Sequence, residues 1–182
     1  YRFLESPHGG KIEFARTKVN KKRRKRGKKN KSLEDRNFIN DRPESINERQ
    51  DIGDSEGDFI VSGKEGEGIL LVVVDRKVRT AFIEKITEVS IENVHAAFVK
   101  IKKRFPEMRT MTTDNDILFR RHKELEKLLS IKIYFCHPYH SWEKGTVENT
   151  NKYIRKYIPK SSNISRYSKK FILSIEERLN RR

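Results

Sequence analysis

The sequence predicts an α/β domain in which a mixed sheet of five strands is flanked by helices and preceded by a basic N-terminal extension. Two observations carry this prediction. Residues 68–75 contain an unbroken apolar run, which is typical of a strand buried on both faces at the centre of a sheet. Three predicted strands are then followed by helix, strand, helix, strand and two helices, an order that favours a mixed sheet covered by helices.

The five predicted strands come in two groups. The first three follow one another, and the third alternates polar and apolar residues, as expected of a strand that pairs back with the second. The last two are short β-prone runs, each of which follows a predicted helix. The predicted strands cover residues 58–61, 68–75, 78–86, 110–113 and 131–135.

Four segments carry apolar residues at helical spacing, which predicts amphipathic helices. They cover residues 90–104, 121–130, 145–157 and 168–179. Ser90 is available as the N-cap of the first helix. The side chains expected on the buried faces are Ile91, Val94, Phe98 and Ile101 in the first helix, Leu125, Leu128 and Leu129 in the second, Val147, Thr150, Ile154 and Tyr157 in the third, and Phe171, Ile172 and Ile175 in the fourth.

The charge of the chain is its strongest compositional signal. Its 182 residues carry a formal net charge of +16 and have a sequence pI near 10.0. A chain this basic is attracted to polyanions because binding releases their condensed counterions, so nucleic acid is the expected partner. No apolar run is long enough to span a bilayer, which argues against a membrane partner. The single cysteine excludes an intrachain disulfide framework and fits a reducing compartment.

Residues 1–50 are predicted to be a largely extended or partly disordered basic segment, and residues 51–182 the core domain. Within residues 21–31, nine of the eleven residues are basic. Such a run repels itself and stays extended until a polyanion neutralises it. A disordered tail without a specific target is the alternative interpretation. The candidates for nucleic-acid contact in this run are Lys21, Lys22, Arg23, Arg24, Lys25 and Arg26.

Three acidic residues are candidates for a metal site. Asp58 begins the first predicted strand, and Asp114 directly follows the fourth. If these strands are neighbours, the two carboxylates face one another, because adjacent strands lie only about 5 Å apart. Two such carboxylates repel unless a cation lies between them, which implies Mg²⁺ or Mn²⁺. Glu148, on the third predicted helix, is expected to close the cluster from another side.

Each of the strand acids has a competitor. Asp75 ends the second predicted strand, although its position is more typical of a turn. Asp116 is an alternative to Asp114, or a residue of the turn that follows it. The cluster therefore depends on which strands are neighbours, and that is a matter of the fold.

Glu148 shares one face of its predicted helix with two cations, Lys152 and Arg155. This arrangement suits metal-dependent phosphoryl transfer, because the acid holds a divalent ion and the cations meet phosphates. Exposed ion pairs on a solvated helix give the same pattern, so the helix alone does not decide between the two interpretations.

The loop after the last predicted strand carries further candidate residues. Cys136, His137 and His140 have a spacing that resembles zinc ligands, but no fourth ligand pattern follows, so the sequence alone does not favour a zinc site. Tyr139 and Trp142 offer rings that stack on bases, or that wedge the loop against its own core.

The same loop and the helix after it resemble a known family. Residues 134–151, YFCHPYHSWEKGTVENTN, are similar to the last catalytic block of the IS-thirty family of bacterial insertion-sequence transposases. Upstream, residues 56–58 resemble the approach to that family's first acidic residue, and residues 113–115 resemble its second. The 33 residues between Asp114 and Glu148 match the family's characteristic separation. Further matches are Arg42, Pro43, Arg49, Arg155, Tyr157 and Pro159.

The resemblance implies a ribonuclease-H-like fold, shared with retroviral integrases, whose C-terminal end is incomplete here. It implies an Asp58, Asp114 and Glu148 triad that uses Mg²⁺ to cut the ends of the element and then joins the freed 3′-hydroxyl to target DNA. Lys152 and Arg155 match positions that are often basic in such enzymes and are expected to contact DNA. The partners implied are the element ends, the target DNA and further copies of the protein assembled on DNA, in the bacterial cytoplasm at the nucleoid.

The chain departs from the family's usual pattern at four positions. Ser55 replaces an aromatic residue, Asp116 a glycine, Leu118 a glutamate and Lys152 a glycine. The family's N-terminal helix-turn-helix region is not found in this sequence. Three alternatives therefore stay open: a decayed transposase copy, a nucleic-acid-binding module without catalysis, and a nuclease of the same fold that hydrolyses DNA without joining it.

Overall fold

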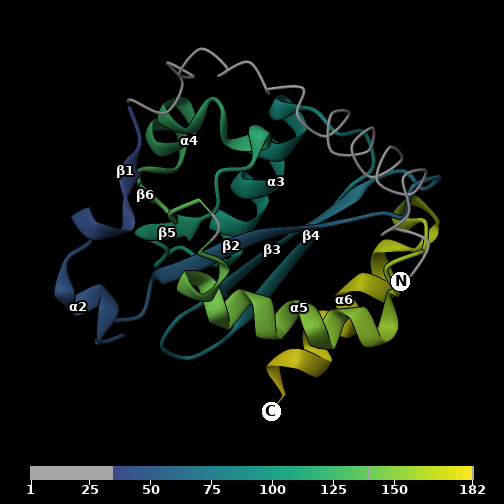
Figure 1. The fold of residues 1–182 in the computed structure, drawn as a ribbon. Helices are drawn as coiled ribbons and strands as arrows, with labels where there is room; N and C mark the ends of the chain where they lie inside the picture. Colours follow the sequence, from purple (N-terminus) through teal and green to yellow (C-terminus); the bar gives the residue numbers. More distant parts are fainter. Residues whose placement is uncertain (1–34, 139, 182) are drawn as a thin grey trace, which may run out of the picture. The chain divides into compact units, whose positions relative to one another are not determined.

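The computed structural model describes residues 35–138 and 140–181, which form a six-stranded sheet with helices on both faces (Figure 1). The predicted DNA-contacting run at residues 21–31 lies outside the described residues. The strands are β1 (Asn37–Phe38), β2 (Asp54–Val61), β3 (Ile69–Asp75), β4 (Ala81–Ile86), β5 (Thr110–Thr113) and β6 (Lys132–Phe135). The helices are α2 (Glu44–Asn47), α3 (Ile91–Arg104), α4 (His122–Leu129), α5 (Gly145–Tyr157) and α6 (Lys169–Asn180).

The strands are arranged in the order β1-β6-β5-β2-β3-β4. β2, β3 and β4 pair antiparallel, whereas β2, β5, β6 and β1 pair parallel. The predicted mixed α/β sheet is confirmed, but the predicted number of five strands is wrong for the described residues. The additional strand, β1, has only two residues, so it contains no alternation by which a strand is recognised in a sequence.

The first predicted strand is longer than expected, since β2 begins at Asp54 and not at Asp58. The added residues are polar and yet buried: Asp54, Ser55 and Glu56 are at most 1% exposed. Their side chains hydrogen-bond to groups outside β2 instead of packing in an apolar core. Apolar alternation is therefore absent from this half of the strand, although it lies inside the sheet.

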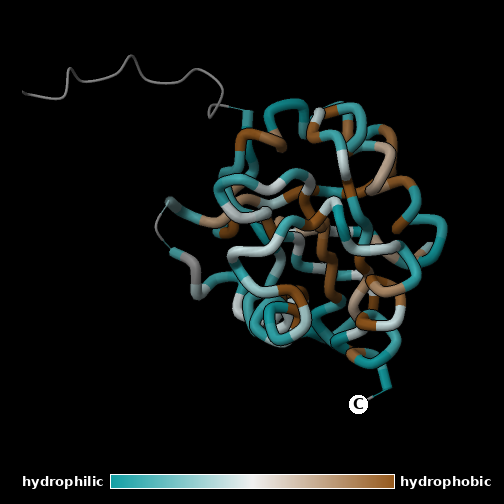
Figure 2. Tube along the Cα trace, turned by 90° about the vertical axis from the view of Figure 1, so that its right-hand side faces the viewer, coloured by the Kyte–Doolittle hydropathy of each residue, from teal (hydrophilic) through white to brown (hydrophobic). Residues whose placement is uncertain are grey.

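Two apolar cores, one on each face of the sheet, position the helices (Figure 1). Residues of β3 alternate between them: Leu71 and Val73 belong to the core beneath α3 and α4, and Leu70 and Val72 to the core beneath α5 and α6. The unbroken apolar run thus has the two-sided burial that the sequence predicts. Figure 2 shows hydrophobic segments, in brown, running through the interior of the trace. None of the helices in the described residues combines the length and apolarity of a membrane span.

The predicted buried faces of the helices are mostly correct. Three of the residues predicted to be buried are instead exposed: Leu128 by 56%, Phe171 by 37% and Tyr157 by 36%. On α4, the buried stripe is His122, Leu125 and Leu129, which leaves Leu128 on the solvent side of the helix. The predicted residues that are buried are Val94, Phe98, Ile101, Leu125, Leu129, Val147, Ile154, Ile172 and Ile175. The predicted N-cap is confirmed, because the Ser90 side chain accepts the backbone N–H of Asn93.

Residues 35–50, which the sequence analysis assigns to the basic extension, pack on the edge of the sheet. β1 pairs with β6, and the buried Arg42 donates to Thr112 Oγ1 on β5 at 3.0 Å. Ile46 is buried as well. This segment therefore contributes to the same sheet as the residues that follow it.

Replacing Ile154 with alanine is expected to lower the free energy of unfolding by about 2–5 kcal/mol, because this fully buried side chain joins α5 to the sheet and its removal leaves a cavity. Leu128→Ala is the control, with an expected change within about 0.5 kcal/mol, since that side chain is exposed. Urea denaturation followed by circular dichroism measures both. Equal losses in the two variants would contradict the burial described above.

Candidate active site

Asp58 and Asp114 come together because of the register between two parallel strands. β2 and β5 are neighbours and pair from Asp54 with Thr110 to Glu56 with Thr112. Asp58 and Asp114 each lie two residues beyond the last pair, at the point where β5 has ended. The condition set by the sequence, that the first and fourth predicted strands are neighbours, is confirmed.

One ammonium group contacts both carboxylates. Lys144 Nζ donates to Asp58 Oδ1 at 2.8 Å and to Asp114 Oδ2 at 2.8 Å. The Lys144 side chain is 6% exposed, whereas those of Asp58 and Asp114 are 19% and 44% exposed. The two acids therefore share a single, nearly buried cation.

The charged groups at this site change one another's pKa. Burial disfavours the charged form of Lys144, but attraction to Asp58 and Asp114 outweighs it, so the pKa of Lys144 is raised. For Asp58, burial is the dominant effect and raises the pKa of the carboxyl, while Lys144 offsets only part of that increase. The ammonium is thus held in its charged form, and Asp58 retains a greater proton affinity than an exposed aspartate.

Helix α5 presents a polar face to the same two strands. Asn151 Nδ2 donates to Asp58 Oδ2 at 2.7 Å. Glu148 lies one helical turn before Asn151 and shares that face of the helix, and its side chain is half-buried. Among the described residues, Glu148 makes no hydrogen bond or ion pair with Asp58 or Asp114. The two aspartates are therefore in contact through Lys144, and Glu148 is on the helix face that contacts Asp58.

Glu56 fixes the start of α5 on the sheet. Its side chain is buried, and Oε2 accepts the backbone N–H of Val147, in the first turn of α5, at 2.9 Å. Oε1 accepts Arg76 Nε at 3.1 Å, which makes a buried ion pair. A carboxylate is favourable at this place because the first N–H groups of a helix lack intrahelical partners and carry a partial positive charge. Glu56, which lies two residues before Asp58 on β2, therefore fixes the position of α5.

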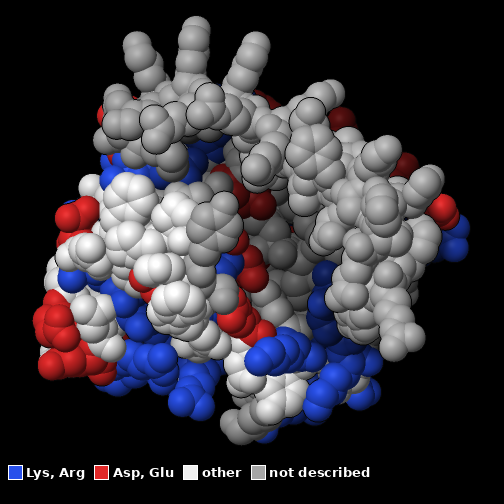
Figure 3. Space-filling view, in the orientation of Figure 1, with Lys and Arg blue, Asp and Glu red and all other residues white. Residues whose placement is uncertain are grey.

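The predicted DNA-contacting cations on α5 differ in their surroundings. Lys152 is exposed. Arg155 donates to the carbonyl oxygens of Val61 at 2.9 Å and Pro159 at 3.3 Å, and burial lowers the pKa of its guanidinium. Figure 3 shows Lys and Arg side chains, in blue, gathered along the lower edge of one face, with acidic side chains, in red, above them. The six predicted cations from Lys21 to Arg26 lie outside the described residues.

The competing acids have structural roles. Asp75 is fully buried and accepts three backbone N–H groups at 2.8–2.9 Å, which confirms its interpretation as a turn acid. Asp116 Oδ1 accepts the N–H of Leu118 at 2.8 Å and caps the short 3-10 helix η3 (Ile117–Phe119).

Cys136 is buried, and burial raises the pKa of its thiol to about 12, which disfavours the thiolate that binds zinc. Tyr139 is outside the described residues, and Trp142 is exposed rather than wedged into the core.

Three residues that make close contacts at this site are not among the candidates predicted from the sequence: Lys144, Asn151 and Glu56. Asn151 lies three residues after Glu148, so helical spacing is the signal that points to it, whereas Lys144 lies just before α5 and has no such signal. Glu56 carries no such signal, because a glutamate inside a strand is usually a solvent-facing residue.

The chemistry of the Asp58 and Asp114 side chains suits a hard divalent cation. Asp58 and Asp114 offer carboxylate oxygens, which Mg²⁺ and Mn²⁺ prefer. The ammonium of Lys144 stands in the position of a shared cation, since it lies within 2.8 Å of an oxygen from each acid. Two carboxylates on adjacent strands, Asp58 within β2 and Asp114 just after β5, are thus only partly compensated by one positive charge, as a site for a divalent cation requires.

The chain is similar in sequence to insertion-sequence transposases. No family model matches the chain. The chain is 37% identical over 188 residues to the transposase for insertion sequence element IS4351 of Bacteroides fragilis, covering 100% of this chain and 57% of the relative. It is 34% identical over 146 residues to transposase InsI for insertion sequence element IS30A of Escherichia coli (strain K12), covering 79% of this chain and 38% of the relative.

The predicted relationship to the IS-thirty family of insertion-sequence transposases is confirmed. The chain spans about half the length of the curated relatives it matches. A third relative, a probable transposase for insertion-like sequence element IS1161 of Streptococcus salivarius, is 34% identical over 168 residues, with 92% of this chain and 47% of the relative covered.

Solved structures share the fold. The HTLV-2 integrase catalytic core domain, solved in complex with magnesium, has a TM-score of 0.50 and 20% identity, with 69% of this chain and 82% of that chain covered. A chain of the simian T-cell lymphotropic virus intasome has a TM-score of 0.54 and 18% identity, with 68% and 46% covered. At these identities the likeness concerns the fold, and the predicted ribonuclease-H-like architecture is confirmed.

Glu56→Ala is expected to lower the free energy of unfolding by about 3–5 kcal/mol, because it leaves the buried Arg76 without its acid and the Val147 N–H without an acceptor. Chemical denaturation measures the loss. The exposed Glu65, changed to alanine, is the control and should shift the value by less than about 0.5 kcal/mol. A Glu56→Ala variant as stable as the control would show that this buried pair does not fix α5.

Lys144→Gln is expected to raise the pKa of Asp58 further, because the ammonium is the main effect that lowers it. Carboxyl NMR titration in metal-free buffer measures this pKa, and the exposed Lys152→Gln is the control. Since the folded state of the variant binds the Asp58 proton more tightly than the unfolded state, its stability should increase as the pH falls through the folded pKa of Asp58 towards the ordinary aspartate pKa of 3.8. An unchanged Asp58 pKa in Lys144→Gln would contradict the shared ion pair.

Proposed function

We propose that this chain is the catalytic core of a DNA transposase, in which Asp58, Asp114 and Glu148 bind Mg²⁺ or Mn²⁺ and catalyse cleavage and transfer of DNA strands. The observation that carries the proposal is the pair of carboxylates, Asp58 and Asp114, each 2.8 Å from one ammonium nitrogen. The similarity to insertion-sequence transposases over all of this chain supports it. A comparison with a metal-bound integrase core of the same fold supports the metal.

Glu148 completes the proposed triad from α5. Asn151, one turn further along the helix, hydrogen-bonds Asp58, so the face that carries Glu148 is directed to the same strand. Glu56 holds the first turn of α5, which keeps this face in register with Asp58. In this proposal the Glu148 side chain reaches the shared cation by a change of rotamer, while the backbone of α5 stays in place.

The reaction is two displacements at phosphorus. In cleavage, a water oxygen bonds to phosphorus, the bond to the 3′-oxygen breaks, and that oxygen takes up a proton. In strand transfer, the freed 3′-hydroxyl loses its proton and bonds to a target phosphorus, the bond from that phosphorus to the target's own 3′-oxygen breaks, and this leaving oxygen takes up a proton. When bound, a divalent ion supplies the positive charge that stabilises the attacking and leaving oxygens.

The residues of this chain hold the DNA and the acids in place. Asn151 fixes one oxygen of Asp58 by donating to it. The exposed Lys152 is available to a phosphate, and the run from Lys21 to Arg26 adds a sequence-independent attraction to DNA. Arg155, tied to two carbonyl oxygens, contributes by its charge and by holding the end of α5 to β2.

The proposed partners are the ends of the element, the target DNA and further copies of the protein assembled on DNA. Pairing two ends requires at least two active sites acting together, and the integrase core of HTLV-2 is described in a dimeric form. The proposed location is the bacterial cytoplasm at the nucleoid, where the DNA is.

The proposal is tested with the full-length transposase, Mg²⁺ and DNA carrying the element ends. Asp58→Asn, Asp114→Asn and Glu148→Gln are each expected to reduce strand joining by at least about 10³-fold while DNA binding is retained, because the acids are needed for chemistry and not for affinity. The control is the exposed Glu177→Gln on α6, which should join as the unaltered protein does.

Analysis of the DNA products separates the alternatives. Joining that survives all three substitutions would refute the triad. Mg²⁺-dependent nicking without joined product would indicate a nuclease, and DNA binding without any strand cleavage would indicate a binding module or a decayed copy.

A further inference from the structure

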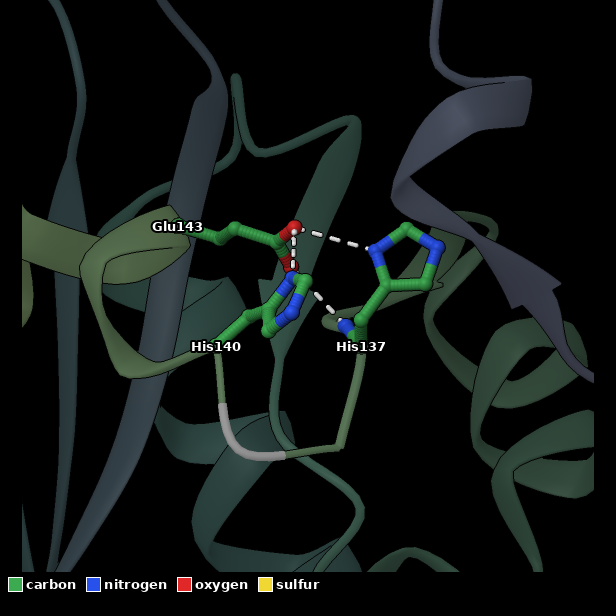
Figure 4. A group of neighbouring side chains, drawn as sticks. All are labelled: His137, His140 and Glu143. Carbon is green, nitrogen blue, oxygen red and sulfur yellow. Dashed lines mark hydrogen bonds and ion pairs between the residues drawn. The ribbon is translucent and has the colours of Figure 1, made fainter.

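The loop between β6 and α5 carries a compact group of side chains that the proposed reaction does not use. His137, His140 and Glu143 each direct one ligand atom towards the others, and these three atoms lie within 4.8 Å of one another (Figure 4). Glu143 lies on the 3-10 helix η4 (Ser141–Lys144), which leads into α5. The three residues are spaced three positions apart in the sequence, and the turn of the loop brings their side chains together.

The distances are close to those of a tetrahedral metal site. His137 Nδ1 lies 2.9 Å and His140 Nδ1 3.2 Å from the same oxygen, Glu143 Oε1. Ligands bound to Zn²⁺ at about 2.0–2.1 Å in tetrahedral geometry are separated from each other by roughly 3.3 Å. The two histidine–glutamate distances therefore differ from the tetrahedral value by a few tenths of an ångström, and the two imidazole nitrogens, within 4.8 Å of each other, need only approach one another to become ligands of one ion.

Neighbouring groups hold the three side chains in these orientations. Glu143 Oε2 accepts the backbone N–H of His137 at 2.8 Å, which leaves Oε1 directed at the two imidazoles. The His137 ring stacks on Phe38 with centroids 5.7 Å apart, and the His140 ring stacks on Trp142 at 4.4 Å. Such outer contacts orient metal ligands and strengthen binding.

We propose that His137, His140 and Glu143 bind Zn²⁺, with water as the fourth ligand. Two imidazoles and one carboxylate suit a borderline ion such as Zn²⁺, whereas the carboxylates of Asp58 and Asp114 suit a harder one. A cavity of about 360 Å³ beside the group leaves room for the fourth ligand; it is lined by Asp114, His137, His140 and Lys144, among others. The cysteine that the sequence pairs with these histidines, Cys136, is replaced by Glu143 as the third ligand.

Zn²⁺ at this position fastens the loop that carries Lys144. Glu143 and Lys144 are adjacent, so binding of the first residue fixes the backbone from which the second reaches Asp58 and Asp114. The proposed Zn²⁺ site is structural. Its test measures Zn²⁺ binding without DNA, so the result does not depend on the proposed transposase activity.

The test is Zn²⁺ binding by the 182-residue chain after its metals have been removed with EDTA. Competition with a chromogenic chelator is expected to show one Zn²⁺ bound per chain, with an affinity reduced at least about 10-fold in His137→Gln, His140→Gln and Glu143→Gln, since each loses one of three ligands. His95→Gln, a partly exposed histidine on α3, is the matched control and should bind as the unaltered chain does. Zn²⁺ should also raise the melting temperature of the unaltered chain and of the control, but not that of the three variants.

Asp58→Asn/Asp114→Asn distinguishes this site from the active site and should leave Zn²⁺ binding unchanged. Because His140 is 43% exposed, His140→Gln is expected to fold, and circular dichroism verifies this. Zn²⁺ binding that persists in the folded His140→Gln variant, or that disappears in the double aspartate variant, overturns the proposal. Failure of the unaltered chain to bind Zn²⁺ overturns it as well and leaves the group as a hydrogen-bonded cluster.

Discussion

The buried carboxylate of Glu56 is the constraint on which the rest of the site depends. It lies on β2, two residues before Asp58, and it accepts an N–H from the first turn of α5 and a guanidinium N–H from Arg76. Burying this charge is costly unless both oxygens are satisfied, so the helix and the sheet are held in one relative position. Apolar packing of Val147 and Ile154 supplies affinity between α5 and the sheet, but the directed bonds of Glu56 specify the register.

Asp58 and Asp114 concentrate negative charge at the central strands β2 and β5, and Lys144 offsets part of it. Two unit charges about 4 Å apart interact by roughly 4 kcal/mol at an effective dielectric constant near 20. One ammonium that contacts two carboxylates provides two attractive pairs against one repulsive pair, which offsets part of the cost of burying these charges. In the proposed metal-bound state, a divalent ion would bring twice the charge of the ammonium to the same two acids.

The sequence predicts those parts of this structure that apolar patterning controls. β3, with its continuous apolar run, and the stripes of α3 and α5 are recognised because burial and periodicity coincide. The first half of β2 is not predicted from the sequence, because the buried side chains of Asp54, Ser55 and Glu56 form hydrogen bonds and give no apolar pattern. The register that aligns Asp58 with Asp114 arises from strand pairing between residues more than 50 positions apart, and no local pattern encodes it. Lys144 is missed for a related reason, since its partners are known only once the strands are placed.

The loop before α5 links these elements physically. Its Glu143 is held by two histidines and a backbone N–H, while the next residue, Lys144, extends to the two aspartates. Lys144 donates to one oxygen of each aspartate, so an ion that took these two oxygens would displace its ammonium. The loop backbone and the start of α5 are anchored separately, by Glu143 and by Glu56. The lysine side chain is therefore free to leave the acids while the helix that carries Glu148 stays where it is.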